Sequence, residues 1–254
     1  MKRSRGKVFL VGAGPGAPDL ITVRGAEILG RAEVVFHDAL VHPGTLELAA
    51  SAEKIAVGKR CGGHATAQQF INKRLVDAAR KHRVVVRLKG GDPMLFGRAH
   101  EEISALEAAG VPYEVVPGVT SALAAAAEAG ISLTRRGSAR TVAFVTPRVG
   151  KGESPSGWAK SAAHADTAVI YMGAGEAGAI TAALLAAGAP RDTPVLVVEN
   201  ATLTESRRIA LTLEELPEIA RYGVTGPTLI MTGRVFEDAL AASAQEALQK
   251  YARA

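Results

Sequence analysis

Short β-branched segments alternate with amphipathic ones through the first half of the chain, and this alternation limits the possible folds most strongly. Each short segment has four or five residues and is bounded by turn residues, which predicts strands. The predicted strands are residues 7–11, 33–37, 54–57, 84–88 and 113–116. Helical patterns at 18–32, 66–82 and 99–110 separate them. Because helical crossovers join parallel strands, we expect a parallel sheet covered by helices on both faces.

The segment 66–82 has the clearest helical pattern, with Thr66 suited to cap its N-terminus. Its apolar residues recur on one side. The face predicted to be buried consists of Phe70, Ile71, Leu75, Val76 and Ala79.

The second half of the chain begins after a polar segment without periodicity, SLTRRGSAR, which predicts a linker over 132–140. Five further strands are expected at residues 141–146, 167–172, 194–199, 206–211 and 228–232. Too few residues join the third to the fourth for a helical crossover, so that pair should be antiparallel and the second sheet mixed. The expected organisation is α/β throughout: a parallel-sheet domain over 1–131, a mixed-sheet domain over 141–240 and a helical tail over 241–254.

Composition excludes several classes of function. The chain has 254 residues, of which 48% are hydrophobic, and no apolar run is long enough to span a membrane. The N-terminal apolar run is too short for a signal peptide, so a cytoplasmic location is expected. The single cysteine, Cys61, excludes an intrachain disulfide.

The net charge of +5 is compatible with nucleic acid or with an acidic small ligand. Aromatic residues make up only 4% of the chain, which leaves few platforms for stacking bases, so no nucleic-acid partner is expected. Arginines near glycine-rich segments instead favour an acidic ligand; they are Arg60, Arg87, Arg98, Arg135 and Arg136.

Four glycine-rich loops each follow a predicted strand. They are GAGPGAPD (12–19), KGGDPMLFGR (89–98), PGVTSA (117–122) and YMGAGE (171–176). Open α/β sheets bind ligands at the carboxyl ends of their strands. Four such loops therefore predict one composite ligand site.

The first loop matches the G-x-G-x-x-A pattern of dinucleotide-binding turns, and Asp38 could serve as the acidic partner of a ribose. However, Pro15 and Pro18 remove two backbone donors where a pyrophosphate would need them. A glycine turn that only reverses the chain is the alternative. An NAD-linked oxidoreductase is thus a weakened hypothesis.

The other loops offer polar side chains with two interpretations each. Asp92 could bind ribose hydroxyls or an ammonium group, or it could cap a turn. Thr120 and Ser121 could contact a ligand, or cap the helix that they precede.

Two residues at strand ends are candidates for acid–base chemistry. Asp38 is the candidate general base, and Lys59 is a candidate acid or anion binder. The six histidines are scattered without a metal-binding motif, so no metal site is expected.

Several motifs together resemble the tetrapyrrole methylase family. They are VGAGPGAPDLIT, HDALV, VGKRCGGH, RLKGGDPMLFGR, VPGVTSA, GISLTRR and YMG, in the family's order and spacing. The resemblance runs from about Lys7 to Phe236. The combination of VGKR with KGGDP is similar to the members that convert uroporphyrinogen III to precorrin-2, in a stand-alone form.

The resemblance implies two α/β domains, with S-adenosylmethionine bound in the cleft between them, in a homodimer. It implies methylation of uroporphyrinogen III at C-2 and C-7, with S-adenosylhomocysteine released, in sirohaem or cobalamin biosynthesis; the sequence does not distinguish these pathways. Asp38 corresponds to the proton acceptor and Lys59 to the proton donor. The implied cofactor contacts are Pro15, Gly90, Gly91, Asp92, Leu95, Thr120, Ser121, Met172, Ala201 and Thr228.

Three alternatives stay open at this stage. The first is a methylase that acts on a later precorrin. The second is the NAD-linked oxidoreductase, and the third is a non-catalytic ligand sensor on the same fold.

Overall fold

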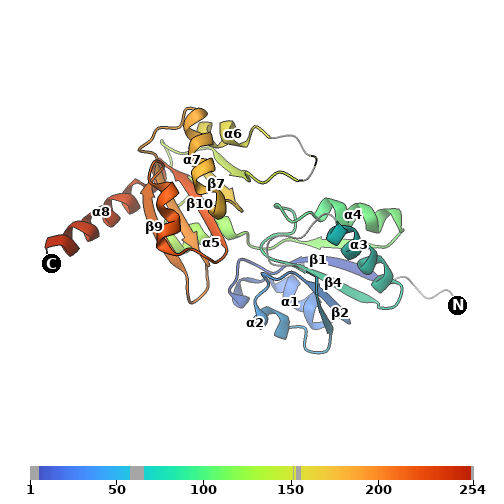
Figure 1. Ribbon diagram of the computed structural model, residues 1–254. Helices are drawn as coiled ribbons and strands as arrows, with labels where there is room; N and C mark the ends of the chain where they lie inside the picture. Colours follow the sequence, from blue (N-terminus) through green and yellow to red (C-terminus); the bar gives the residue numbers. More distant parts are fainter. Residues whose placement is uncertain (1–5, 58–65, 151, 153–155, 253–254) are drawn as a thin grey trace. The chain divides into compact units, whose positions relative to one another are not determined.

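The computed structural model describes residues 6–57, 66–150, 152 and 156–252. The chain divides into two compact units, Met1–Ser121 and Ala122–Ala254 (Figure 1).

The first unit has one five-stranded sheet in the order β3-β2-β4-β1-β5. All of its strand pairs are parallel, as predicted from the alternating pattern. The strands are β1 (Lys7–Gly12), β2 (Val34–His37), β3 (Glu53–Ala56), β4 (Val84–Lys89) and β5 (Tyr113–Val116). The helices are α1 (Val23–Gly30), α2 (Pro43–Glu47), α3 (Thr66–Ala79) and α4 (Ala99–Ala108), with a 3-10 turn η1 (Pro18–Leu20).

Helices cover both faces of this sheet (Figure 1). On one face α3 and α4 pack, and Leu10 and Val85 meet Leu75 in one core. On the other face α1 packs, and Val11 and Val86 belong to a second core. Successive residues of β1 and β4 therefore enter different cores, as the period of two in a strand requires.

The prediction for the buried face of α3 is wrong at one residue. Ile71, Leu75 and Ala79 are buried, but the Phe70 side chain is 57% exposed. The Arg74 guanidinium carbon lies 5.5 Å from the centre of the Phe70 ring, so the ring makes a cation–π contact at the surface instead of packing in the core.

The second unit has a mixed sheet in the order β6-β7-β10-β8-β9. Only β6 and β7 pair in parallel; the predicted antiparallel pair, β8 with β9, is confirmed. The strands are β6 (Val142–Val145), β7 (Thr167–Tyr171), β8 (Pro194–Glu199), β9 (Arg207–Thr212) and β10 (Thr228–Gly233). The helices are α5 (Ser121–Ala129), α6 (Trp158–His164), α7 (Ala177–Ala186) and α8 (Glu237–Ala252), with 3-10 segments η2 (Ala174–Glu176), η3 (Leu216–Tyr222) and η4 (Arg234–Phe236).

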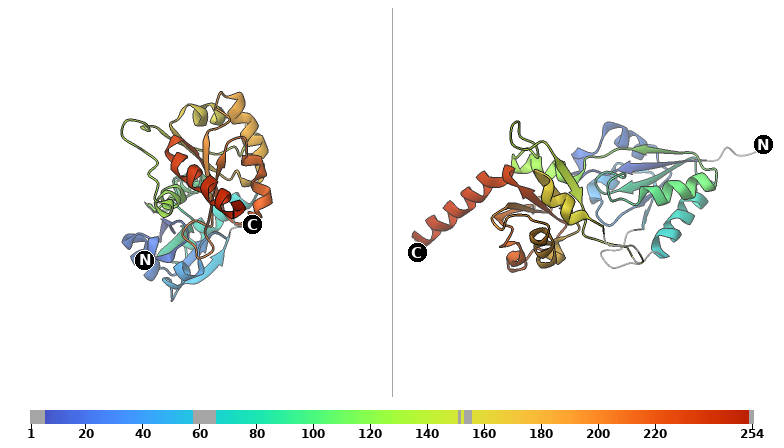
Figure 2. Two further views of the ribbon diagram at one scale, coloured as in Figure 1. Left: turned by 90° about the vertical axis from the view of Figure 1, so that its left-hand side faces the viewer. Right: turned by 90° about the horizontal axis from the view of Figure 1, so that it is seen from above.

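Two cores flank this sheet as well. One contains residues of α6, α7 and η3, and the other contains the alanines of α5 together with Phe236 of η4. The C-terminal helix α8 extends away from the sheet of its unit (Figure 2).

The segment predicted as a linker, 132–140, lies within the second unit. Its polar side chains face outward, but Leu133 and Ala139 are buried in the same core as α5. Arg135 and Ala139 also form an isolated β-bridge. The division between the units falls earlier, at Ser121 and Ala122.

Candidate active site

Two glycine-rich loops of the first unit are joined backbone to backbone. Gly14 and Gly91 form an antiparallel bridge, with N–O distances of 3.3 Å from Gly14 and 2.7 Å from Gly91. The Ala13 amide donates to the Lys89 carbonyl at 2.7 Å. The loop after β1 is therefore fastened to the loop after β4.

The loop after β5 joins the same cluster through glycine contacts. A Cβ placed on Gly12 would lie 2.6 Å from the Gly118 Cα and 2.7 Å from the Gly91 carbonyl oxygen. Such distances are too short for any side chain. Glycine is thus required at position 12 because three loop backbones meet there.

Asp92 strengthens the cluster with its side chain. Its Oδ1 accepts from the Met94 amide at 2.8 Å, and its Oδ2 accepts from the Gly118 amide at 2.9 Å. The carboxylate thus caps a turn, one of its two predicted interpretations, and ties the loop after β4 to that after β5. Since a carboxylate has about four acceptor positions, it can also accept from a ligand.

Asp38 lies at the end of β2, beside these loops. Its amide donates to the Leu88 carbonyl at 3.2 Å, which places it at the carboxyl edge of β4. Leu40, on the same turn, has its Cβ 3.4 Å from the Cβ position of Gly90. The Asp38 side chain is 29% exposed, so solvent or a ligand can reach it.

A group of buried charged side chains lies directly behind Asp38. The Arg87 Nη2 donates to the Asp38 Oδ1 at 2.5 Å, and the Arg87 Nε donates to the Glu102 Oε1 at 2.8 Å. Lys89 also donates to the Glu102 Oε1, at 3.2 Å. We call Asp38, Arg87, Lys89 and Glu102 the charge quartet; it holds two cations and two carboxylates.

Burial and charge act in opposite directions on the two cations of the quartet. Burial lowers the pKa of Arg87, but the charges of Asp38 and Glu102 outweigh it and raise that pKa. The pKa of Lys89 is lowered by burial and then by the charge of Arg87, against the attraction of Glu102.

One sequence-based interpretation fails here. Arg87 was expected among the arginines that favour an acidic ligand, but its side chain is 3% exposed and is bound by two carboxylates of the chain itself. The quartet was not predicted. Its one signal in the sequence is the pair of basic residues, Arg87 and Lys89, at the end of a buried strand. An uncompensated charge is costly there, so each needs a partner.

The histidines near Asp38 have structural contacts. The His42 Nδ1 accepts from the Gly44 amide at 3.1 Å and so caps α2. The His37 Nδ1 lies 3.2 Å from the Asp38 carbonyl oxygen. Within the described residues, no three His, Cys, Asp or Glu side chains are grouped to hold a metal ion; the prediction of no metal is not tested by this.

Three of the predicted cofactor residues belong to the second unit, and each lies at or next to the end of a strand. Met172 follows β7 and is 45% exposed, Ala201 follows β8 and is buried, and Thr228 begins β10 and is half-buried. The Thr228 hydroxyl donates to the Gly226 carbonyl at 2.9 Å.

Glu199, at the end of β8, fixes the loop that precedes Thr228. Its Oε1 accepts from the amides of Thr225 and Gly226 at 2.7 and 2.6 Å, and its Oε2 accepts from Arg207. Burial raises the pKa of Glu199, but the Gly226 amide, Arg207 and the Thr225 amide lower it more, so the net shift is downward. A buried carboxylate at the end of β8 thus holds the loop that leads into β10.

Backbone strain is concentrated in loops that follow strands, two of which are predicted glycine-rich loops. Across the part of the chain that the structure describes, five residues other than glycine have positive φ: Phe96, Arg98, Met172, Asn200 and Thr202. All five follow β4, β7 or β8. Such conformations are uncommon outside glycine and gather at functional sites.

The predicted residues of the first unit are thus brought to one edge of its sheet, in half-buried positions. They are Pro15, Asp38, Gly90, Gly91, Asp92, Leu95, Thr120 and Ser121. Lys59, together with Arg60 and Cys61, lies outside the described residues. The roles assigned to all of these side chains stay predictions.

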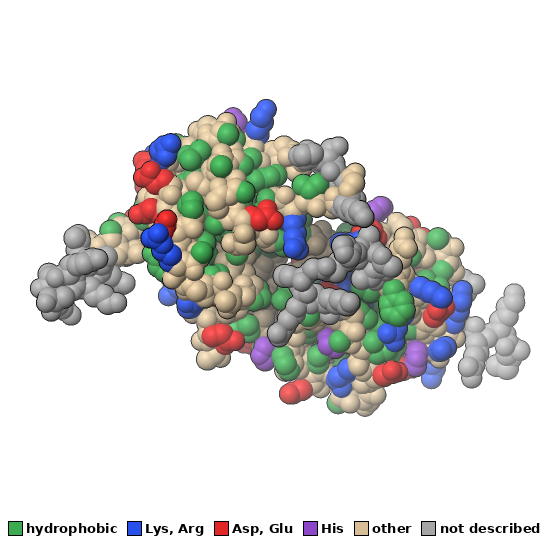
Figure 3. Space-filling view, viewed as in Figure 1, with side chains coloured by type: hydrophobic (Ala, Val, Ile, Leu, Met, Phe, Trp, Pro, Cys, Tyr) green, Lys and Arg blue, Asp and Glu red, His purple; other side chains and the backbone are tan. Residues whose placement is uncertain are grey.

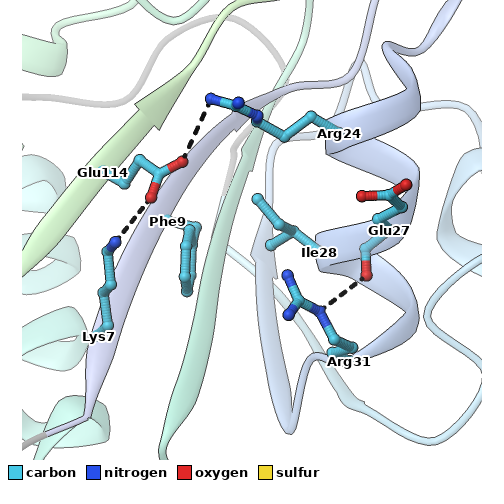
Figure 4. Close-up of a pocket in the computed structure, with 7 residues that line it drawn as sticks. All are labelled: Lys7, Phe9, Arg24, Glu27, Ile28, Arg31 and Glu114. Carbon is cyan, nitrogen blue, oxygen red and sulfur yellow. Dashed lines mark hydrogen bonds and ion pairs between the residues drawn. The ribbon is translucent and has the colours of Figure 1, made fainter.

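A groove at a different position of the first unit contains none of the predicted residues (Figure 4). It is lined by Lys7, Phe9, Arg24, Glu27, Ile28, Arg31 and Glu114. Lys7 begins β1, so the groove lies toward the amino ends of the strands. There Lys7 pairs with Glu114 at 2.6 Å. Because ligands of such sheets bind at the carboxyl ends, this groove is not the candidate site.

On one face of the molecule, charged side chains of both signs are present. On the face drawn in Figure 3, Lys and Arg side chains alternate with Asp and Glu. No helix of the described residues is both long enough and apolar enough to cross a membrane.

Comparison with protein families gives one match that spans most of the chain. The family model described as Tetrapyrrole (Corrin/Porphyrin) Methylases matches residues 7–217.

Curated relatives include two proteins named sirohaem synthase. The one from Zymomonas mobilis is 44% identical over 232 residues, and the one from Tolumonas auensis is 47% identical over 232 residues. Each match covers 91% of this chain but 49% of the relative. The chain therefore spans about half the length of the curated relatives that it matches.

Solved structures similar to this chain cover it almost fully. The uroporphyrin III C-methyl transferase from Thermus thermophilus is 43% identical, with a TM-score of 0.80 over 91% of this chain and 98% of that chain. A second structure of that protein is a complex with S-adenyl homocysteine, with the same identity and coverage. A cobalt precorrin-4 methyltransferase is 32% identical, with a TM-score of 0.80 over 91% of this chain and 96% of that chain.

Proposed function

The chain belongs to the tetrapyrrole (corrin/porphyrin) methylases, and we propose that it methylates uroporphyrinogen III at C-2 and C-7 with S-adenosylmethionine, giving precorrin-2. The observation that carries the proposal is the position of Asp38. Its carboxylate lies at the carboxyl edge of the parallel sheet, held by Arg87 and next to three fastened glycine loops.

The loops offer contacts of the kind that S-adenosylmethionine needs. Among the residues that the structure describes, only the Leu40 Cβ lies within 4 Å of a Cβ added to Gly90, so the backbone there can be approached closely. Asp92 offers acceptor positions for hydroxyl or ammonium donors. S-adenosylmethionine, when bound, supplies an electrophilic methyl group on sulfur.

Asp38 then has a defined task. An electron-rich pyrrole carbon that gains a methyl group must lose a proton from the macrocycle, and a positioned carboxylate is a suitable base. Arg87 holds the Oδ1 atom of Asp38. We assign the proton to the Oδ2 atom, which the Arg87 contact orients without occupying.

The dinucleotide alternative loses support from the hydrogen bonds of the first loop. A pyrophosphate needs free backbone amides. The amides of Ala13 and Gly14 are bound to the Lys89 and Gly91 carbonyls, and Pro15 has none. Three successive positions of the loop are thus unavailable to a phosphate.

Action on a later precorrin is the second candidate, because the cobalt precorrin-4 methyltransferase is also similar over most of the chain. Its identity of 32% is lower than the 43% of the uroporphyrin III enzyme. We therefore rank uroporphyrinogen III first among the substrates.

The test is an anaerobic incubation of the full chain with uroporphyrinogen III and S-adenosylmethionine, followed by mass spectrometry. Addition of two methyl groups supports the proposal. An unchanged macrocycle, together with methylation of a later precorrin in a parallel incubation, would replace the first candidate by the second. An unchanged macrocycle in every incubation, with cofactor still bound, would favour a ligand sensor.

We also propose, from the family resemblance, that the chain works as a homodimer in the cytoplasm. Sedimentation analysis at micromolar concentration tests the first statement, and fractionation of the source cells tests the second. A role in making sirohaem or cobalamin would follow from the reaction but is not distinguished by it.

A further inference from the structure

We propose that Glu102 is a positioning residue, which holds the Arg87 guanidinium in the orientation that fixes the Asp38 carboxylate. This inference rests on the proposed function, because it assumes that Asp38 takes part in the reaction. Glu102 itself lies on α4 and is fully buried, so it acts through Arg87.

Glu102 receives several donors on a single atom. Its Oε1 accepts from the Arg87 Nε at 2.8 Å, from the Lys89 Nζ at 3.2 Å and from the Gln68 Nε2 at 3.2 Å. Hydrogen bonds to an ionised acceptor are stronger than neutral ones, and they are stronger still away from water. The two cations of β4 therefore hold this oxygen most strongly, and the uncharged amide of Gln68 on α3 contributes less.

Arg87 transmits that position to Asp38 because its guanidinium is planar and rigid. The Nε is held by Glu102, and the Nη1 donates to the carbonyls of Phe36 and Leu88 at 3.4 and 3.2 Å. With two of its three nitrogens held, the direction of the Nη2 is set. That third nitrogen donates to the Asp38 Oδ1.

The exposure of the charge quartet points in the same direction. The side chains of Arg87, Lys89 and Glu102 are at most 4% exposed, whereas Asp38 is 29% exposed. A buried, balanced set of charges is on average no more stable than apolar residues of the same volume. Asp38 is the one member of the quartet that solvent or a ligand can reach. The buried members therefore serve to orient the Asp38 carboxylate.

The experiment is a double-mutant cycle between Glu102→Gln and Asp38→Asn, measured as kcat and KM for uroporphyrinogen III. We expect Glu102→Gln alone to lower kcat about 10- to 100-fold, since a misplacement of about 1 Å can cost that much, with KM changed less than threefold. In the Asp38→Asn background, the same substitution should lower kcat less than twofold, because the group that it positions is already gone.

Gln68→Met is the matched control. It also removes a buried hydrogen bond to Glu102, but it changes no charge and leaves the Arg87 contacts in place. We expect its kcat within twofold of wild type. An equal loss from Gln68→Met would mean that any damage to this core reduces activity, and would overturn the inference.

The outcomes separate the inference from the proposed function. Full turnover by Asp38→Asn would overturn both the base assignment and the inference. A large loss in Asp38→Asn, with an equal further loss from Glu102→Gln, would overturn the inference alone.

If Glu102→Gln does not fold, Arg87→Lys replaces it in the cycle. Lysine keeps the charge but lacks the fork that reaches two carboxylates. The same loss of effect in the Asp38→Asn background is expected. Urea unfolding of wild type, the two single variants and the double variant, without substrate, adds a readout that needs no activity. If the two residues interact, their shifts in unfolding midpoint should not add; additive shifts would count against the interaction.

Discussion

The substitution Gly12→Ala tests most directly whether the three loops of the first unit form one rigid cradle. The added methyl carbon would lie 2.6 Å from the Gly118 Cα and 2.7 Å from both the Gly118 nitrogen and the Gly91 oxygen. All three are backbone atoms, so no side-chain rotation relieves the contact.

The size of the effect follows from these distances. Ordinary contact begins near 3.4 Å, so at least one loop must retreat by about 0.8 Å. Overpacking of this kind costs about 1–3 kcal/mol. At roughly 2–4 °C per kcal/mol for a chain of this length, Tm should fall by about 2–12 °C. A shift of nearly 1 Å in the loops should also weaken binding of S-adenosylhomocysteine, by about 10- to 100-fold.

The assay is isothermal titration calorimetry with S-adenosylhomocysteine, together with thermal melts of the free protein. Gly178→Ala is the control, because it adds the same methyl group on the exposed side of α7, with nothing within 4 Å. Since alanine favours helix over glycine by up to about 1 kcal/mol, this variant should be as stable as wild type or more so, and should bind the ligand normally. Normal melting and binding by Gly12→Ala would refute the idea that the loops are packed together.

Three further outcomes are expected. Asp38→Asn should lower kcat about 10²- to 10⁴-fold, the range for loss of a general base, while calorimetry shows S-adenosylhomocysteine still bound. Glu199→Gln should make the unfolding free energy less sensitive to acid. The pKa of Glu199 is lowered in the fold, so the ionised carboxylate stabilises the protein at pH values above the usual pKa near 4.5, and this stabilisation is lost as the pH falls further. Urea titrations from pH 7 to 3 would show the difference. Phe70→Ala should cost less than about 1 kcal/mol and Leu75→Ala about 2–5 kcal/mol by urea unfolding, because only the second side chain is buried; equal costs would contradict the assignment of the α3 faces.

Much of the fold could be predicted because it depends on local patterns. Strands such as Tyr113–Val116 and Pro194–Glu199 are apolar, β-branched and bounded by turn residues, and the structure has them with the predicted bounds. The antiparallel pairing of β8 with β9 followed from the shortness of their connection.

The errors have a common physical origin in contacts between distant residues. Helical periodicity placed Phe70 on the apolar side of α3, but its side chain is exposed and lies beside Arg74. β4 is buried on both faces, so alternation along it could not tell which way Arg87 points. Its partner Glu102 comes from a helix whose orientation only the packed structure determines.

The candidate site was predicted as a set of loops, and its supporting contacts were not. Glycine and proline identify turns, because they restrict or permit particular backbone conformations. The bond from the Gly118 amide to Asp92 joins residues from different loops, and nothing in either segment requires it. Motifs thus locate a site, whereas its rigidity depends on contacts that arise only after folding.

In the second unit, hydrogen bonds hold a strained loop after β8 in place. Asn200 and Thr202 have positive φ angles of 52° and 70°, which cost roughly 1–2 kcal/mol each for residues other than glycine. Backbone bonds offset that strain: the Asn200 amide donates to the Pro227 carbonyl at 2.8 Å, and the Thr202 amide donates to Glu128 at 2.6 Å. Ala201 lies between the two strained residues. Removing the Glu128 carboxylate should therefore release the backbone around Ala201 without touching any predicted cofactor contact, and the loop would lose its shape before the sheet loses its stability.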